Sequence, residues 1–211
     1  MSFQNGLYYV ILCDDNLQTQ REEIIKKPLA FIDVETTGLN SQLHEIIEVS
    51  IIRVCPKKGM TNYTSKIKPV HIEYAEPRAL AINGYNEKDW FHAPDAEQVM
   101  SRVADLTSGC ILVGHNVRFD EEFISETCFR NGIKTRYDRR MIDTVTLALE
   151  HLHNLESVSM DSIREYFDWK EGHRARIDVL QTYLLYKKLN RATVFHRLFW
   201  RVRYLLRSLL P

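Results

Sequence analysis

The sequence predicts an α/β fold built on a mixed β-sheet, and three observations lead to this prediction. Strand-like runs come first, at 29–35, 45–54 and 62–68, and short turns separate them. Shorter apolar runs then alternate with helical segments along the rest of the chain. No internal repeat or low-complexity linker divides the 211 residues. Strands with short links favour an antiparallel meander, and the later alternation favours an α/β arrangement around the same sheet.

The early strands are recognised by their apolar runs and by the turn residues between them. Gly38–Ser41 and Pro56–Gly59 provide turn signals after the first and second runs. A further strand is expected at 7–13, followed by a polar connector. We therefore expect residues 1–28 to form an N-terminal extension that packs on the domain.

The second half of the chain reads as alternating helices and short strands. Apolar spacing and helix stop signals such as Asn131–Gly132 place these elements. The expected elements are a helix at 95–107, strands at 110–114 and 139–142, a helix at 119–131, and helices from Thr144, after Ser159 and at 175–190. The main domain is thus expected to span 29–191.

Residues 192–211 form a separate basic amphipathic helix in this interpretation. Apolar residues recur with helical spacing from Phe195 to Leu209. No acidic residue follows Asp178, and the segment after it carries seven Lys and Arg, so a net charge of zero hides a basic end and an acidic body. Packing on the domain and docking to a partner, nucleic acid or a membrane surface are all open uses of this helix.

Composition and cysteine usage limit the class of protein. The chain is 45% hydrophobic and 27% charged, as in ordinary globular proteins. The four cysteines are scattered without metal-binding spacing, which favours reduced thiols and a cytoplasmic location. No run reaches the roughly 18–20 apolar residues of a membrane-spanning helix, so an integral membrane protein is not expected.

Two carboxylates interrupt the apolar run "LAFIDVETTGL". Asp33 and Glu35 stand two residues apart, so in a strand they point to the same face. Paired acids on a mostly buried strand repel each other and are costly to desolvate. This arrangement indicates a binding site for a cation.

Two further clusters supply chemically active side chains. Asp120 opens a helix in "LVGHNVRFDEEFI", where alone it could be a helix N-terminal residue. His173 and Asp178 lie five residues apart in "GHRARIDVLQTY", so His173 must precede the helix that carries Asp178 if both serve one site. Each alone could be a surface residue. The carboxylates of Asp33, Glu35 and Asp178 are oxygen ligands of the kind that suit Mg²⁺ or Mn²⁺, and a nearby histidine can take the proton from an attacking water. This combination predicts metal-assisted phosphoryl hydrolysis.

The three segments resemble the motifs of the DEDDh 3′–5′ exonucleases. "FIDVETTGL", "GHNVRFD" and "HRARID" match D-x-E-T-T-G-L, H-N-x-x-F-D and H-x-A-x-x-D in the family's order. The resemblance is to the group that includes the proofreading subunit of bacterial DNA polymerase III. It implies an RNase H-like fold with a five-stranded mixed sheet flanked by helices.

The resemblance also implies roles for individual residues. Asp33, Glu35 and Asp178 are expected to bind one of two Mg²⁺ (or Mn²⁺) ions, with Asp33 and Asp120 binding the second. His173 is expected to be the general base. The terminal nucleotide is expected to be held by Thr36, Thr37, Gly38, Leu39, His115 and Asn116.

Substrate and partner stay open at this stage. The 3′ end of single-stranded DNA is favoured as substrate, and an RNA-directed exonuclease of the same family is the alternative, because the motifs act on the phosphodiester and not on the sugar. A polymerase-associated nucleic-acid-binding module is a third hypothesis, with a polymerase or another protein bound through the C-terminal helix. The sequence does not indicate an oligomeric state.

Overall fold

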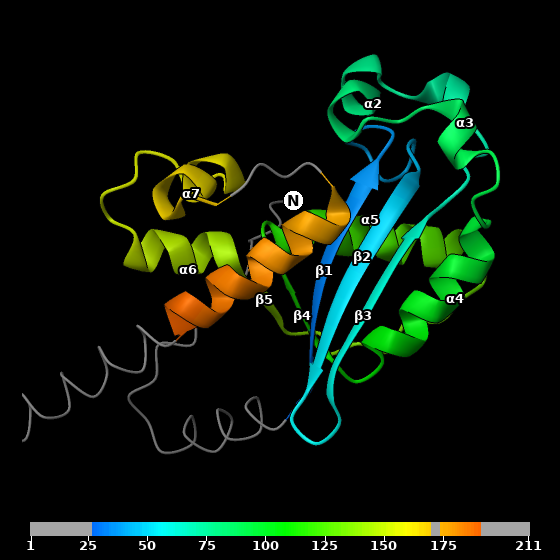
Figure 1. Cartoon of the computed structure of the whole chain (residues 1–211). Helices are drawn as coiled ribbons and strands as arrows, with labels where there is room; N and C mark the ends of the chain where they lie inside the picture. The colour runs from blue at the N-terminus through cyan, green and yellow to red at the C-terminus, as the bar shows by residue number, and fades with distance from the viewer. Residues whose placement is uncertain (1–26, 170–173, 191–211) are drawn as a thin grey trace, which may run out of the picture.

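A computed structural model describes residues 27–169 and 174–190, and its centre is a five-stranded mixed sheet with the order β3-β2-β1-β4-β5 (Figure 1). The first three strands are antiparallel and the last two run parallel to β1. Their bounds are β1 Leu29–Thr36, β2 Ile46–Cys55, β3 Gly59–Lys66, β4 Ile111–Gly114 and β5 Met141–Asp143. The predicted meander and mixed sheet are confirmed.

Helices connect and cover these strands. The shorter ones, between β3 and β4, are η1 Ile72–Tyr74, α2 Pro77–Asn83 and α3 Glu87–Trp90. The longer ones are α4 Ala96–Thr107, α5 Val117–Arg130, α6 Thr144–His151 and α7 Met160–Phe167, and a last helix covers 175–190. None of the described helices is long and apolar enough to cross a membrane.

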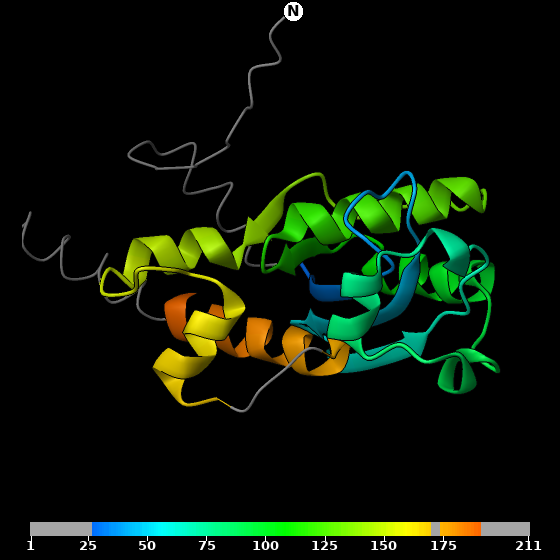
Figure 2. The same cartoon turned by 90° about the horizontal axis from the view of Figure 1, so that it is seen from above.

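The two faces of the sheet are covered by different helices (Figure 2). Ala30, Ile32 and Val34 of β1 pack into a core with residues of α4 and α5. Phe31, which lies between Ala30 and Ile32 in β1, points to the opposite face of the sheet and packs against Val179 of helix 175–190. The alternation of a strand therefore divides β1 between a large apolar core and a smaller layer under the last helix.

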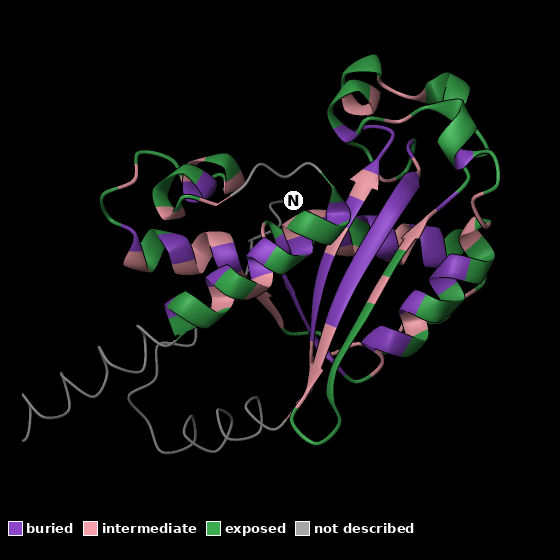
Figure 3. Cartoon of the chain, viewed as in Figure 1, coloured by how far each residue is buried: buried purple, intermediate pink, exposed green. Residues whose placement is uncertain are grey.

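Burial follows the position of each strand in the sheet (Figure 3). The first seven residues of β2 are all buried, whereas most of β3 is exposed because it forms an edge. β3 begins at Gly59, earlier than the predicted 62, since Cys55 already pairs with Gly59 across a short turn. Gly59 has φ +78°, a backbone conformation that glycine adopts without strain.

Some predicted elements fall on parts of the chain that the structure does not describe. The strand at 7–13, the packing of the 1–28 extension before residue 27, and the helix at 192–211 all lie outside the described residues. These three expectations stay predictions.

Candidate metal and nucleic-acid site

The candidate site begins with two acids on β1. Asp33 and Glu35 point to one face of the strand, the face that also carries Phe31. Across the β1–β2 ladder Asp33 is paired with Ser50 and Glu35 with Glu48, and the register shifts immediately after Glu35. Both acids therefore lie near the carboxyl end of a central strand, where the regular ladder stops.

Asp178 reaches the same place from helix 175–190. Its neighbour Val179 packs with Phe31, so the helix lies on the acidic face of β1. The side-chain oxygens of Asp33, Glu35 and Asp178 lie within 4.8 Å of one another. The tertiary structure thus joins three carboxylates from two elements that are far apart in the sequence.

Asp120 lies beside this trio, at the first turn of α5. The pairing of β4 with β1 stops at Phe31, so β4 offers no partner to the Val34 amide. That amide donates a hydrogen bond to Asp120 Oδ1 at 3.0 Å, and Asp120 is buried. Asp120 is not one of the three residues whose oxygens lie within 4.8 Å of one another, although its charge acts on Asp33.

The surroundings of the acids favour their protonated forms. Burial raises the pKa of Asp33 well above its ordinary value, and the charges of Asp120, Asp178 and Glu35 raise it further. Burial, Asp178 and Glu48 raise the pKa of Glu35 to about 7. The charge of Arg164 opposes the rise at Asp33, and the charges of Arg174 and then Arg164 oppose it at Glu35. Excess negative charge of this kind is relieved by a bound cation.

The donor set fits a divalent cation. Carboxylate oxygens are the ligands that Mg²⁺ and Mn²⁺ prefer. Oxygens bound to one Mg²⁺ at about 2.1 Å lie about 3–4.2 Å apart. The separations of up to 4.8 Å between the three carboxylates need only small side-chain adjustments to reach that range.

The turn after β1 is buried and tightly bonded except at its tip. The Thr36 hydroxyl donates to the Gly38 carbonyl at 2.7 Å, and the side-chain amide of Asn83, on α2, donates to the Thr36 carbonyl at 3.0 Å. A Cβ at Gly38 would lie 2.4 Å from the His44 ring, so any other residue there would force this buried ring to move. Leu39 is 75% exposed. The turn therefore presents an apolar side chain on a rigid support.

Thr37 belongs to the same support. It is buried, its hydroxyl accepts from the Glu45 amide at 2.9 Å, and its carbonyl accepts from the Glu76 amide at 2.7 Å. These bonds join the turn to the start of α2 and to the segment before β2.

His115 and Asn116 lie at the junction between β4 and α5. The Nδ1 atom of His115 is 3.0 Å from the Thr144 hydroxyl, and the Asn116 amide donates to Asp143 Oδ1 at 3.0 Å. Asn116 has φ +68° and immediately precedes α5. Both residues are thus bonded to the start of α6, and their expected contact with a nucleotide stays a prediction.

His173 lies outside the described residues, so its expected role as a base is not tested by the geometry. Two residues near the acids were absent from the sequence prediction. Glu48 is buried opposite Glu35, and Arg164 of α7 forms an ion pair with Asp178. Neither belongs to a motif; only the strand register and the packing of α7 bring them to the site.

Known proteins with similar sequences include a ribonuclease and a DNA polymerase. The Exonuclease family (RNase_T) matches residues 30–186. Ribonuclease T of Shewanella sp. is 31% identical over 172 residues, which cover 72% of this chain and 76% of that protein. The PolC-type DNA polymerase III of Caldanaerobacter subterraneus is 27% identical over 173 residues, which cover 81% of this chain but 12% of the polymerase.

The fold is also found among solved structures. E. coli exonuclease I in complex with a dA16 oligonucleotide superposes with a TM-score of 0.67 at 20% identity. The match covers 88% of this chain and 46% of exonuclease I. The predicted RNase H-like fold is confirmed. With the family match over 30–186 and the three ordered motifs, the chain belongs to the Exonuclease family and to its DEDDh group.

Proposed function

We propose that this protein is a metal-dependent 3′–5′ exonuclease that hydrolyses the terminal phosphodiester of single-stranded DNA and releases nucleoside monophosphates. The observation that carries the proposal is the meeting of Asp33, Glu35 and Asp178, whose oxygens lie within 4.8 Å of one another. The raised pKa values show that ionised carboxylates at this place are destabilised by burial and by one another. Groups perturbed in this way cluster at functional sites, and a bound divalent cation would stabilise their ionised forms. Catalysis is assigned to the domain at 29–191.

The acids would hold two ions, Mg²⁺ or Mn²⁺. Asp33, Glu35 and Asp178 would bind the first, and Asp33 with Asp120 the second. Bound divalent cations supply positive charge that stabilises the attacking and leaving oxygens of a phosphodiester. The position of Asp120 beside Val34, with its charge acting on Asp33, supports its inclusion.

The other site residues bind substrate and move a proton. His173 would accept the proton of the attacking water, because an imidazole titrates near neutral pH. Thr36, Thr37 and Gly38 would support the terminal nucleotide, with the exposed Leu39 against its base. His115 and Asn116 would border the same pocket.

DNA is the favoured substrate and RNA the second candidate. The PolC-type polymerase relative and the DNA-bound exonuclease I support DNA. Ribonuclease T, which is 31% identical, supports RNA. A polymerase or another protein partner, bound through 192–211, remains part of the proposal because the PolC-type relative is itself a polymerase.

The test is hydrolysis of end-labelled DNA and RNA strands of equal sequence, each with Mg²⁺, Mn²⁺ or EDTA. We expect stepwise shortening from the 3′ end that EDTA abolishes, faster on DNA. Faster shortening of RNA would select the second candidate. Binding of both strands without shortening under any metal would contradict the enzyme and favour a binding module.

A further inference from the structure

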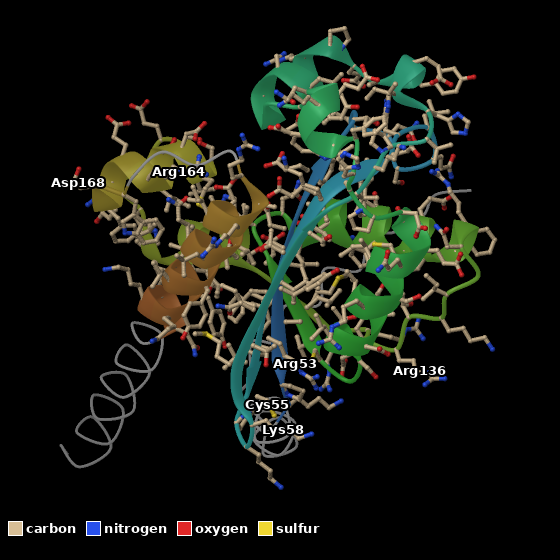
Figure 4. The ribbon with its side chains drawn as sticks, turned by 45° about the vertical axis from the view of Figure 1, so that its right-hand side comes forward. Arg53, Cys55, Lys58, Arg136, Arg164 and Asp168 are labelled. Carbon is tan, nitrogen blue, oxygen red and sulfur yellow. The ribbon has the colours of Figure 1, made fainter. Side chains whose placement is uncertain are left out.

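Arg164 is a buried cation next to the proposed metal ligands. In the part of the chain that the structure describes, it is the only arginine or lysine that is buried, with 6% of its surface exposed. Figure 4 shows it on α7, beside helix 175–190. Removing a guanidinium from water carries a large desolvation penalty unless each nitrogen finds a partner. The partners of Arg164 therefore show where this cost is offset.

The three nitrogens of the guanidinium bond to three different side chains. Nε donates to Gln181 Oε1 at 2.8 Å. Nη1 donates to Asp161, and Nη2 donates to Asp178. Because Nε is committed to Gln181, the direction of Nη2 toward Asp178 is fixed by the planar geometry of the group.

Gln181 and Asp178 lie three residues apart on one helix, so a single side chain of α7 holds both. On its other side this helix is held by apolar contacts. Val179 packs with Phe31, and the Tyr183 ring meets the Phe31 ring edge to face at 5.1 Å. Leu185 and Leu189 of the same helix pack in a second apolar cluster with residues of α6 and α7. Apolar contacts place the helix on its neighbours, but they do not orient a carboxylate, whose direction is set by its hydrogen bonds.

The packing of helix 175–190 places the backbone of Asp178, and the direction of its side chain then decides where the carboxylate lies. The β1 ligands have their backbone fixed by the strand pairing of the sheet, while Asp178 has no such ladder. We propose that Arg164 is a positioning residue for metal binding, which holds the Asp178 carboxylate toward Asp33 and Glu35 before the ion arrives. This inference rests on the metal site of the proposed function and adds a residue outside its motifs.

The test measures metal binding without nucleic acid. Mn²⁺ is titrated by electron paramagnetic resonance into wild-type protein and into the Arg164→Met and Arg164→Lys variants. Loss of a hydrogen-bond partner behind a metal ligand costs about 10–100-fold in metal affinity, so we expect this increase in Kd for Arg164→Met. Arg164→Lys keeps the charge but replaces the planar fork of donors with a single ammonium nitrogen, and a smaller increase is expected.

A kinetic measurement separates positioning from general damage. If the proposed nuclease activity is present, the kcat of Arg164→Met should recover as Mn²⁺ is raised, while the KM for DNA stays near the wild-type value. Asp161→Ala is the matched control, since it removes another partner of the same guanidinium at a side chain that is 70% exposed. Its Mn²⁺ affinity should stay within about twofold of wild type, because exposed ion pairs contribute little.

Wild-type or tighter Mn²⁺ affinity in folded Arg164→Met would overturn the inference. If that variant does not fold, as melting with EDTA would reveal, the same criterion applies to Arg164→Lys. Failure of the proposed function is a separate result: the chain would then shorten neither DNA nor RNA, whatever the Mn²⁺ titrations give.

Discussion

The candidate site has a half on the sheet and a half on a helix, and the two halves are held in place by different forces. Asp33 and Glu35 lie on β1, which pairs with β2 along its whole length and with β4 through Phe31. Asp178 lies on helix 175–190, which packs on Phe31 and on an apolar cluster with α6 and α7 and is bonded to Arg164. Backbone hydrogen bonds fix the first half, and side chains fix the second.

This difference predicts unequal tolerance to change. A strand in the middle of a sheet keeps its position when one side chain is altered, because its ladder hydrogen bonds remain. A helix that is held to its neighbours by side-chain contacts alone loses part of its support when one of them is removed. Substitutions on β1 should therefore remove a functional group without moving the strand. Substitutions around helix 175–190 should also change the position of Asp178.

The largest effect is expected on the sheet half. Asp33→Ala removes the acid proposed to contact both ions, so nearly all hydrolysis should be lost while the protein stays folded. Hydrolysis of end-labelled DNA with Mg²⁺, together with a melting curve in EDTA, measures both properties. Turnover close to wild type in a folded Asp33→Ala protein would refute the proposed metal site.

The next largest effect is expected on turnover when His173, the expected general base, is replaced. His173→Ala should lower kcat by about 10²–10⁴-fold, the range for a lost general base. Mn²⁺ affinity should be largely unchanged, because His173 is not an expected metal ligand. Equal losses of Mn²⁺ affinity and of turnover would show instead that His173 acts on the metal.

A third effect is on stability and depends on pH. The pKa of Glu35 is about 7 in the folded protein, against an ordinary 4.5. Between these values the folded protein binds a proton that the unfolded chain has released, so the stability of the metal-free protein falls as pH rises through this window. Glu35→Gln removes the ionisable group and, with it, this loss of stability at high pH.

We therefore expect metal-free Glu35→Gln to be more stable than wild type by about 1–3 kcal/mol at pH 8, with little difference at pH 4. Melting with EDTA across this pH range measures the difference. Glu122→Gln, at an exposed position of α5, is the control and should follow the wild-type pH dependence. A Glu35→Gln protein less stable than wild type at pH 8 would contradict the prediction that the ionised Glu35 carboxylate destabilises the metal-free fold.

The smallest effect tests the apolar support of the helix. Tyr183→Leu removes the ring that meets Phe31 edge to face at 5.1 Å, which should lower stability by about 0.5–1.5 kcal/mol. Hydrogen exchange should become faster in helix 175–190 than in β1, since β1 keeps its ladder. Equal acceleration in both elements would show that the two halves of the site unfold together.

The sequence by itself determined most of the fold. Strand and helix periods are local properties, so the meander, the later helices and the paired acids of β1 could be predicted, several of them to within one or two residues. The short helices between 72 and 90 were not predicted. Pro77 starts α2, but seven and four residues are too few for α2 and α3 to show a clear apolar period.

Only the tertiary structure decided which side chains meet. The motifs nominated Asp178, but its approach to Asp33 and Glu35 depends on the packing of helix 175–190 on the acidic face of β1. Glu48 reaches the site through strand register, and Arg164 through the packing of α7. Such contacts join residues remote in the sequence, and nothing in the local pattern around Glu48 or Arg164 marks them.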